Sequence, residues 1–268
     1  MIEKTNLMSG KRGLVMGVAN DRSIAWGIAK VLRNHGAELA FTFQDQTFEK
    51  RVRPLAEQAG SVLVIPCDVE DKESQKNVFE ILDHEWGTLD FVVHSLAYSD
   101  KHELSGRYLD TSANNFVRTM HISCFSFTEM ANLAQSLMVD NGGSLITLTY
   151  YGAERIMPNY NIMGVAKAAL QTSVKYLAAD LGPNKIRVNA LSAGPVRTLA
   201  GSAIGSARKI YKWSEANAPL RRSVTLDQLG MASLYLLSDL SEGVTGEIHH
   251  VDAGYNIIGL PHLSENKK

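Results

Sequence analysis

Short apolar runs alternate with helical patterns along this chain of 268 residues. The apolar runs lie at 13–17, 38–43, 61–69, 89–95, 144–150, 186–194 and 246–254. The helical patterns lie around 24–36, 46–58, 71–86, 112–138, 160–181 and 226–238. Such alternation, with strands that are apolar on both sides, is typical of a parallel sheet covered by helices on both faces. The sequence therefore predicts an α/β fold, with a doubly wound parallel sheet of about seven strands in a single domain over 1–268.

The charge balance and the cysteine count exclude several classes of protein. The formal net charge is −1, so no overall basic field attracts nucleic acid. Cys67 and Cys124 fit neither a disulfide framework nor a zinc-binding pattern, and we expect no metal site. No apolar run is long enough to cross a membrane, and no signal peptide precedes the first strand. We expect a cytoplasmic protein that ends in a polar, frayed tail at 261–268.

The first predicted strand leads into the loop GVANDRSIAWG, which contains several small residues. Gly17, Ser23, Ala25 and Gly27 would let the backbone approach a pyrophosphate, and Ile24 opens the following helix. The spacing is not a regular G-x-G-x-x-G, and a tight turn that needs small residues for packing is the alternative. The position between a first strand and an amphipathic helix favours a Rossmann-like dinucleotide site.

The ends of the next strands suggest which dinucleotide binds. The second strand ends at Gln44 and is followed by Asp45, with no lysine or arginine before Lys50. A carboxylate here would repel the 2′-phosphate of NADP, so we expect NADH; the alternative is that Asp45 faces solvent and decides nothing. Asp68 and Val69, which end the third strand, are expected to hold the adenine edge.

A tyrosine and a lysine with six residues between them follow the fifth strand, in the segment YYGAERIMPNYNIMGVAK. None of the nine tyrosines has a lysine four residues on, and the pattern present is Tyr160-x6-Lys167. Together with GVANDRSIAWG and AGPVRTLA, this segment resembles the short-chain dehydrogenase/reductase superfamily, and within it the bacterial enoyl-acyl-carrier-protein reductases. The resemblance extends from about Gly13 to Gly254.

The resemblance implies a reaction and a set of residue roles. The reaction is the NADH-dependent reduction of the trans-2 double bond of an enoyl thioester, the last step of each fatty-acid elongation cycle. Tyr160 would stabilise negative charge on the thioester oxygen, and Lys167 would bind the nicotinamide ribose. Tyr150 matches the family's second active-site tyrosine, although an aromatic pocket wall is a serious alternative. Met163 would shape the acyl pocket or the core, and for Tyr151 we expect packing.

Other segments receive roles in the same way. Leu96, after the fourth strand, would line the cofactor site, and Ser99 would reach the substrate. The stretch after the sixth strand would contact the nicotinamide and the pyrophosphate, through Val196, Arg197, Thr198, Leu199 and Ala200. The family resemblance also implies a homotetramer.

A lid and a docking surface are expected around 195–217. The small-residue run there fits a mobile lid over the ligand. Arg208, Lys209 and Lys212 form a basic cluster on which an acidic acyl-carrier protein could dock, although a solvated helix face is an equally weighted alternative. Gly205 stands where relatives often have another basic residue.

Two other functions remain open at this point. A related reductase could act on a ketoacyl or dienoyl thioester, but the spacing between Tyr160 and Lys167 argues against it. In a helix this spacing separates them by about 10 Å along the axis, which suits a substrate whose oxygen is displaced from the carbon that accepts hydride. A nucleotide-binding sensor without catalysis is disfavoured because both residues are present.

Overall fold

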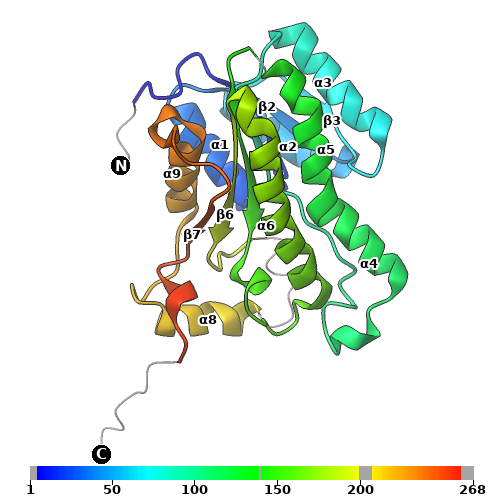
Figure 1. Ribbon diagram of the computed structural model, residues 1–268, viewed down its shortest axis with the longest axis vertical. Helices are drawn as coiled ribbons and strands as arrows, with labels where there is room; N and C mark the ends of the chain where they lie inside the picture. Colours follow the sequence, from blue (N-terminus) through cyan, green and yellow to red (C-terminus); the bar gives the residue numbers. More distant parts are fainter. Residues whose placement is uncertain (1–4, 139, 199–206, 261–268) are drawn as a thin grey trace, which may run out of the picture.

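The computed structural model describes residues 5–138, 140–198 and 207–260 of the chain. In that part of the chain, one parallel sheet holds seven strands in the order β3-β2-β1-β4-β5-β6-β7 (Figure 1). The strands are β1 Arg12–Met16, β2 Glu38–Phe43, β3 Val64–Pro66, β4 Phe91–His94, β5 Gly143–Thr149, β6 Ile186–Ala193 and β7 Ile248–Val251. The predicted α/β fold with a seven-stranded, doubly wound parallel sheet is confirmed.

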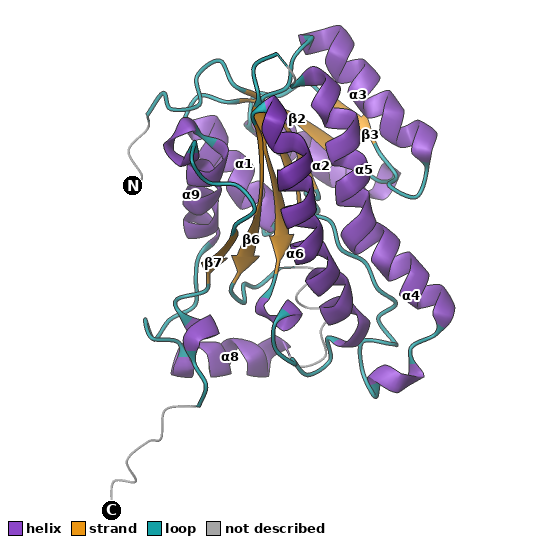
Figure 2. Cartoon of the chain, viewed as in Figure 1, coloured by secondary structure: helices purple, strands orange, loops and turns teal. Residues whose placement is uncertain are grey.

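Helices cover both faces of this sheet (Figure 2). The main helices are α1 Ile24–Asn34, α2 Gln46–Gln58, α3 Lys72–Trp86, α4 Ala113–Met120, α5 Ser126–Ala134, α6 Asn161–Leu181, α8 Ala207–Asn217 and α9 Leu226–Leu237. Helices α1, α2 and α9 pack on one face, and α3, α5 and α6 pack on the other. No helix in the described ranges is both long and apolar enough to span a membrane.

The two faces of the sheet have separate hydrophobic cores because side chains alternate along each strand. On β1, Val15 belongs to the core under α1 and α9, whereas Leu14 and Met16 belong to the core under α3, α5 and α6. On β4, Val93 and Val92 divide in the same way. This double burial explains why the strands are almost continuously apolar in the sequence.

The helical pattern expected at 112–138 is not one helix. A turn of π-helix at His121–Phe125 separates α4 from α5, and a short 3₁₀ turn at Gln135–Leu137 follows α5. The predicted strand at 61–69 is also shorter, because only Val64–Pro66 pairs with β2. Turns of π-helix are rare and gather at functional sites, so this one directs attention to the residues around it.

Candidate active site

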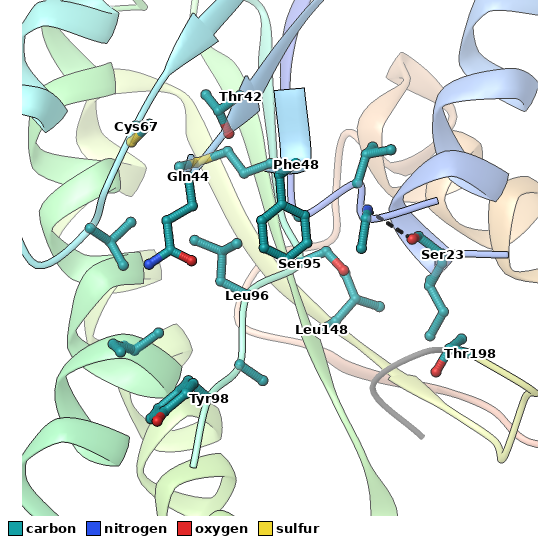
Figure 3. A pocket seen from close by; sticks show the side chains of 18 of the residues that line it. Ser23, Thr42, Gln44, Phe48, Cys67, Ser95, Leu96, Tyr98, Leu148 and Thr198 are labelled. Carbon is teal, nitrogen blue, oxygen red and sulfur yellow. Dashed lines mark hydrogen bonds between the residues drawn. The ribbon is translucent and has the colours of Figure 1, made fainter. Parts of the chain in front are cut away.

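A cavity of about 550 Å³ opens at the carboxyl ends of the strands (Figure 3). The chain passes from β1 to β2 and β3 on one side, and β4 then lies on the other side of β1. In parallel sheets, ligands bind at such a reversal of strand order. The structure brings together eleven of the predicted site residues as cavity lining: Gly17, Ser23, Ile24, Gln44, Asp68, Val69, Leu96, Tyr150, Tyr160, Lys167 and Thr198.

The glycine loop after β1 is held tightly under this cavity. Gly17 has a φ of +92°, and a Cβ atom built on it would lie 2.1 Å from the carbonyl oxygen of Ser95. Only glycine fits this close approach of two backbones. The Ser23 hydroxyl accepts hydrogen bonds from the backbone N–H groups of Ala19 (2.9 Å) and Asn20 (3.0 Å), which fixes the turn into α1; Figure 3 marks one of the two.

Asp45 caps a helix, a role that the sequence prediction did not include. Its carboxylate caps the N-terminus of α2 by accepting hydrogen bonds from the backbone N–H groups of Thr47 (2.7 Å) and Phe48 (3.1 Å). It is exposed and is not among the side chains that line the cavity, whereas Gln44 and Phe48 are. Of the adjacent residues Gln44 and Asp45, the one that lines the cavity is therefore Gln44, with its neutral amide.

Lys167 lies beneath the cavity, and its side chain is almost fully buried. Its ammonium group donates hydrogen bonds to the carbonyl oxygens of Leu148 (2.8 Å) and Leu96 (3.3 Å), at the ends of two adjacent strands. Burial lowers the pKa of Lys167 from 10.5 to about 8. Lys167 is therefore not a solvated lysine on a helix surface, because it is buried and lines the cavity.

Tyr150 and Tyr160 lie side by side in the lining of the cavity. Their rings meet edge to face, with 5.3 Å between centroids. The Tyr150 hydroxyl is buried and has no hydrogen-bond partner among the residues that the structure describes, and burial raises the pKa of both phenols. Leu104 and Met163 pack with Tyr160 in a small apolar cluster that Met157 joins. The two hydroxyls thus keep their protons at neutral pH and adjoin an apolar surface.

The backbone around Tyr160 is unusual. Tyr160 is the residue before α6, not part of the helix, and it lies between Asn159 with φ +59° and Asn161 with φ +35°. Asparagine tolerates this left-handed region better than most residues. The Asn161 side chain donates a hydrogen bond to the Glu103 carbonyl oxygen at 3.1 Å. The position of the tyrosine is therefore set by its neighbours and not by helix geometry alone.

Several other residues have structural surroundings. The Tyr151 ring packs edge to face against Tyr255, as expected for packing. His94 is fully buried between the hydroxyls of Thr147 (3.0 Å) and Ser126 (2.9 Å), and burial lowers its pKa to about 3. It is a neutral, hydrogen-bonded core histidine.

Some predicted site residues do not line the cavity. Met163 is buried beside Tyr160, Ser99 shares hydrogen bonds with Asn115, and Val196 accepts one from the Tyr211 hydroxyl at 2.9 Å. Arg197 is exposed. Leu199, Ala200 and Gly205 lie outside the described residues. The basic residues Arg208, Lys209 and Lys212 are exposed on α8, below the carboxyl ends of the strands (Figure 1).

Sequence reasoning missed other cavity residues, among them Thr42, Phe48, Cys67, Ser95, Tyr98, Arg118, Ile122, Leu148 and Thr149. Most lie at strand ends next to predicted site residues, so their position in the sequence could have indicated that they line the cavity. Arg118 gave no such signal, because it lies on α4, far in sequence from any glycine loop or strand end. Burial raises the pKa of the Cys67 thiol to about 12, which keeps it protonated.

Comparison with known proteins places the chain in a family. The family model described as "Enoyl-(Acyl carrier protein) reductase" matches residues 17–256. An enoyl-[acyl-carrier-protein] reductase [NADH] of Rhizobium meliloti is 59% identical, over 97% of this chain and 95% of that protein.

Two crystal structures of such reductases match closely. The Anaplasma phagocytophilum reductase, solved with NAD, is 58% identical, with a TM-score of 0.94 over 98% of this chain and 100% of the other. The Bacillus cereus reductase, solved with NADP+ and indole naphthyridinone, is 49% identical, with a TM-score of 0.93 over 95% of this chain and 99% of the other. The chain thus belongs to the enoyl-acyl-carrier-protein reductase family of the short-chain dehydrogenase/reductase superfamily.

Proposed function

We propose that this protein is an NADH-dependent enoyl-acyl-carrier-protein reductase, which saturates the trans-2 double bond in the final step of fatty-acid elongation. One observation carries the proposal: a buried lysine and two protonated tyrosines line the same cavity as the glycine loop after β1. This set combines a nucleotide-binding loop, a cation and hydroxyl donors at one edge of the sheet. The family membership and the names of the relatives support the same reaction.

The cavity residues fit NADH. Gly17 and Ser23 form the turn at which a pyrophosphate would meet the N-terminus of α1. Gln44 offers ribose hydroxyls an amide but offers a 2′-phosphate no cation, which supports NADH over NADPH. We further propose that Asp68, Val69 and Leu96 contact the adenosine half, with Ile24, Val196, Arg197, Thr198, Leu199 and Ala200 nearer the pyrophosphate and nicotinamide.

Three side chains are proposed to carry the chemistry. When bound, NADH supplies the hydride that reaches the β-carbon of the enoyl thioester. Tyr160 keeps its proton because its pKa is raised, so its hydroxyl can donate a hydrogen bond to the thioester oxygen as negative charge gathers there. Tyr150 has a buried, unpartnered hydroxyl, which suits a second contact to the same oxygen. The Lys167 ammonium would bind the nicotinamide ribose hydroxyls.

The acyl chain would lie against the apolar cluster of Tyr160, Leu104 and Met163. Met157 and Tyr150 pack against that cluster and extend the apolar surface. We propose Met163 as a residue that shapes the substrate pocket through Tyr160. We keep Ser99, after β4, as a proposed substrate contact.

One assay tests the proposed reaction. NADH oxidation should follow addition of a crotonyl thioester and should be absent with a β-ketoacyl thioester. Turnover of the ketoacyl substrate alone would refute the proposal. In a separate binding measurement, Lys167→Ala should abolish detectable NADH binding, and unchanged affinity would contradict the ribose role.

Assembly and location are also part of the proposal. We propose a cytoplasmic homotetramer of single-domain subunits, each with a lid around 195–217. Exposed apolar side chains on adjacent elements, including Phe116, Val117 and Phe125, support an interface between copies. Light scattering of the purified protein should give the mass of four chains, and a monomer would contradict this.

The carrier protein is the proposed macromolecular partner. Arg208, Lys209 and Lys212 are exposed on one helix and would attract its acidic surface. Reversing all three charges should raise KM for acyl-carrier substrates and leave KM for coenzyme A thioesters unchanged. An equal effect on both substrates would contradict a docking role.

A further inference from the structure

Three side chains from different elements meet at one side of the cavity. Glu70 follows β3, Tyr98 follows β4, and Arg118 lies on α4. Arg118 and Tyr98 line the cavity, whereas Glu70 stands behind Arg118. We call this group the Arg118 clasp.

The clasp fixes the orientation of the Arg118 guanidinium. Its Nε atom lies 2.9 Å and 3.1 Å from the two carboxylate oxygens of Glu70, and its Nη2 atom lies 2.7 Å from Oε2. The Nη1 atom donates to the Tyr98 hydroxyl at 3.2 Å, and the Cζ atom lies 4.4 Å from the centroid of the Tyr98 ring. The hydrogen bond from Arg118 lowers the pKa of Glu70 and keeps the pair charged at neutral pH.

Stability alone is a weak reason for this arrangement. The side chains of Arg118 and Glu70 are 46% and 30% exposed, and ion pairs this exposed add little to folding. The loop that carries Glu70 is also held at the preceding residue, where the Val69 carbonyl oxygen accepts a hydrogen bond from Gln75 Nε2 at 2.7 Å. The ion pair at Glu70 and the hydrogen bond at Val69 thus both hold the segment that follows β3 and borders the cavity.

The chemistry of the clasp suits an aromatic base. Arginine has a planar, weakly hydrated cation that stacks on π-systems, and lysine has not. The carboxylate of Glu70 compensates the charge of Arg118. The guanidinium is therefore better suited to stack on a flat ring than to bind an anion. Asp68 and Val69 also line the cavity and directly precede Glu70, the partner of Arg118; they follow β3, where the adenine of a dinucleotide is expected.

We propose that Arg118 binds the adenine base of the cofactor by stacking, and that Glu70 is its positioning residue. This inference rests on the proposed function, because the ligand is the adenosine half of NADH. Tyr98 supports the guanidinium on its other side. The role concerns cofactor affinity and leaves the hydride-transfer end of the cavity unchanged.

ADP is the probe that tests this proposal, with binding measured by calorimetry on the full-length protein. Arg118→Leu should weaken ADP binding about tenfold, within the range for loss of one stacked base. Arg118→Lys should lose affinity to a similar extent, because lysine cannot stack, and Glu70→Gln should show a smaller loss. In turnover, KM for NADH should rise while kcat stays unchanged.

A matched ion pair provides the control. Arg53 and Glu49 on α2 form a pair of nearly the same exposure, 47% and 32%, and neither lines the cavity. Arg53→Leu and Glu49→Gln should bind ADP as the unaltered protein does. Thermal unfolding of each variant shows that it is folded, and Arg118→Lys and Glu70→Gln still test the proposal if Arg118→Leu does not fold.

Three results would overturn the inference. Unchanged ADP affinity in folded Arg118→Leu would show that Arg118 does not contact the base. Full affinity in Arg118→Lys would show that charge attraction, and not stacking, is the contact, and unchanged affinity in Glu70→Gln would refute the positioning role. Failure of the unaltered protein to bind either ADP or NADH would instead refute the proposed function, and the inference with it.

Discussion

Replacing Lys167 with methionine measures the cost of holding an ammonium ion beneath the cavity. The side chain is only 5% exposed, and burial lowers its pKa from 10.5 to about 8. Below the folded pKa, both the folded and the unfolded chain carry the proton. Between the two pKa values only the unfolded chain binds it, so the free energy of unfolding rises with pH in this window.

The magnitude follows from the width of the window. One pKa unit corresponds to about 1.4 kcal/mol, so an increase from about pH 7 to about pH 9.5, roughly 1.5 units above the folded pKa, adds about 2 kcal/mol. Methionine binds no proton. The stability of the unaltered protein relative to Lys167→Met should therefore increase by about 2 kcal/mol between these pH values. The difference between the two proteins cancels the contributions of other titrating groups.

Urea unfolding of both proteins at the two pH values, at one fixed protein concentration, gives this difference. Lys175→Met is the matched control, because Lys175 lies on the same helix but is exposed. It should show no change of relative stability between the two pH values. If the difference in free energy of unfolding between the unaltered protein and Lys167→Met is the same at both pH values, the reasoning is refuted.

Three further substitutions give distinct outcomes. Tyr160→Phe should lower kcat about 10²- to 10³-fold, the loss typical of one oxyanion donor, with NADH affinity unchanged in a fluorescence titration; full turnover would refute its role. Tyr150→Phe removes a buried hydroxyl that has no partner among the described residues, and it should raise the free energy of unfolding by about 1 kcal/mol in chemical denaturation; a lower free energy of unfolding would contradict this. Gly17→Ala forces a Cβ against the Ser95 carbonyl and should lower Tm and abolish NADH binding; an intact site would contradict the packing argument.

Local pattern was enough to predict the sheet and the centre of the candidate site. Each strand is a short apolar run, and the runs of β1 to β5 end where the cavity begins, so Gln44, Asp68 and Tyr150 could be placed from the ends alone. Lys167 was found from its spacing to Tyr160. Its burial and its two carbonyl partners depend on how α6 crosses two strands, which periodicity does not reveal.

Two features were not predicted from the pattern of strands, for different reasons. Arg118 reaches the cavity only because α4 packs beside the loops after β3 and β4, a contact between segments far apart in sequence. Asp45 has a second role that a local rule could have indicated. Aspartate is a favoured N-cap, and its carboxylate caps α2.

The order of the strands also bears on how the chain can be assembled. Starting from β1, strands β2 and β3 follow on one side, and β4, β5, β6 and β7 follow on the other, each beside its predecessor or beside β1. Every strand that emerges from the ribosome thus meets a free edge of the sheet already made. No strand has to be inserted between two earlier ones, so the sheet can grow outward in the order of synthesis.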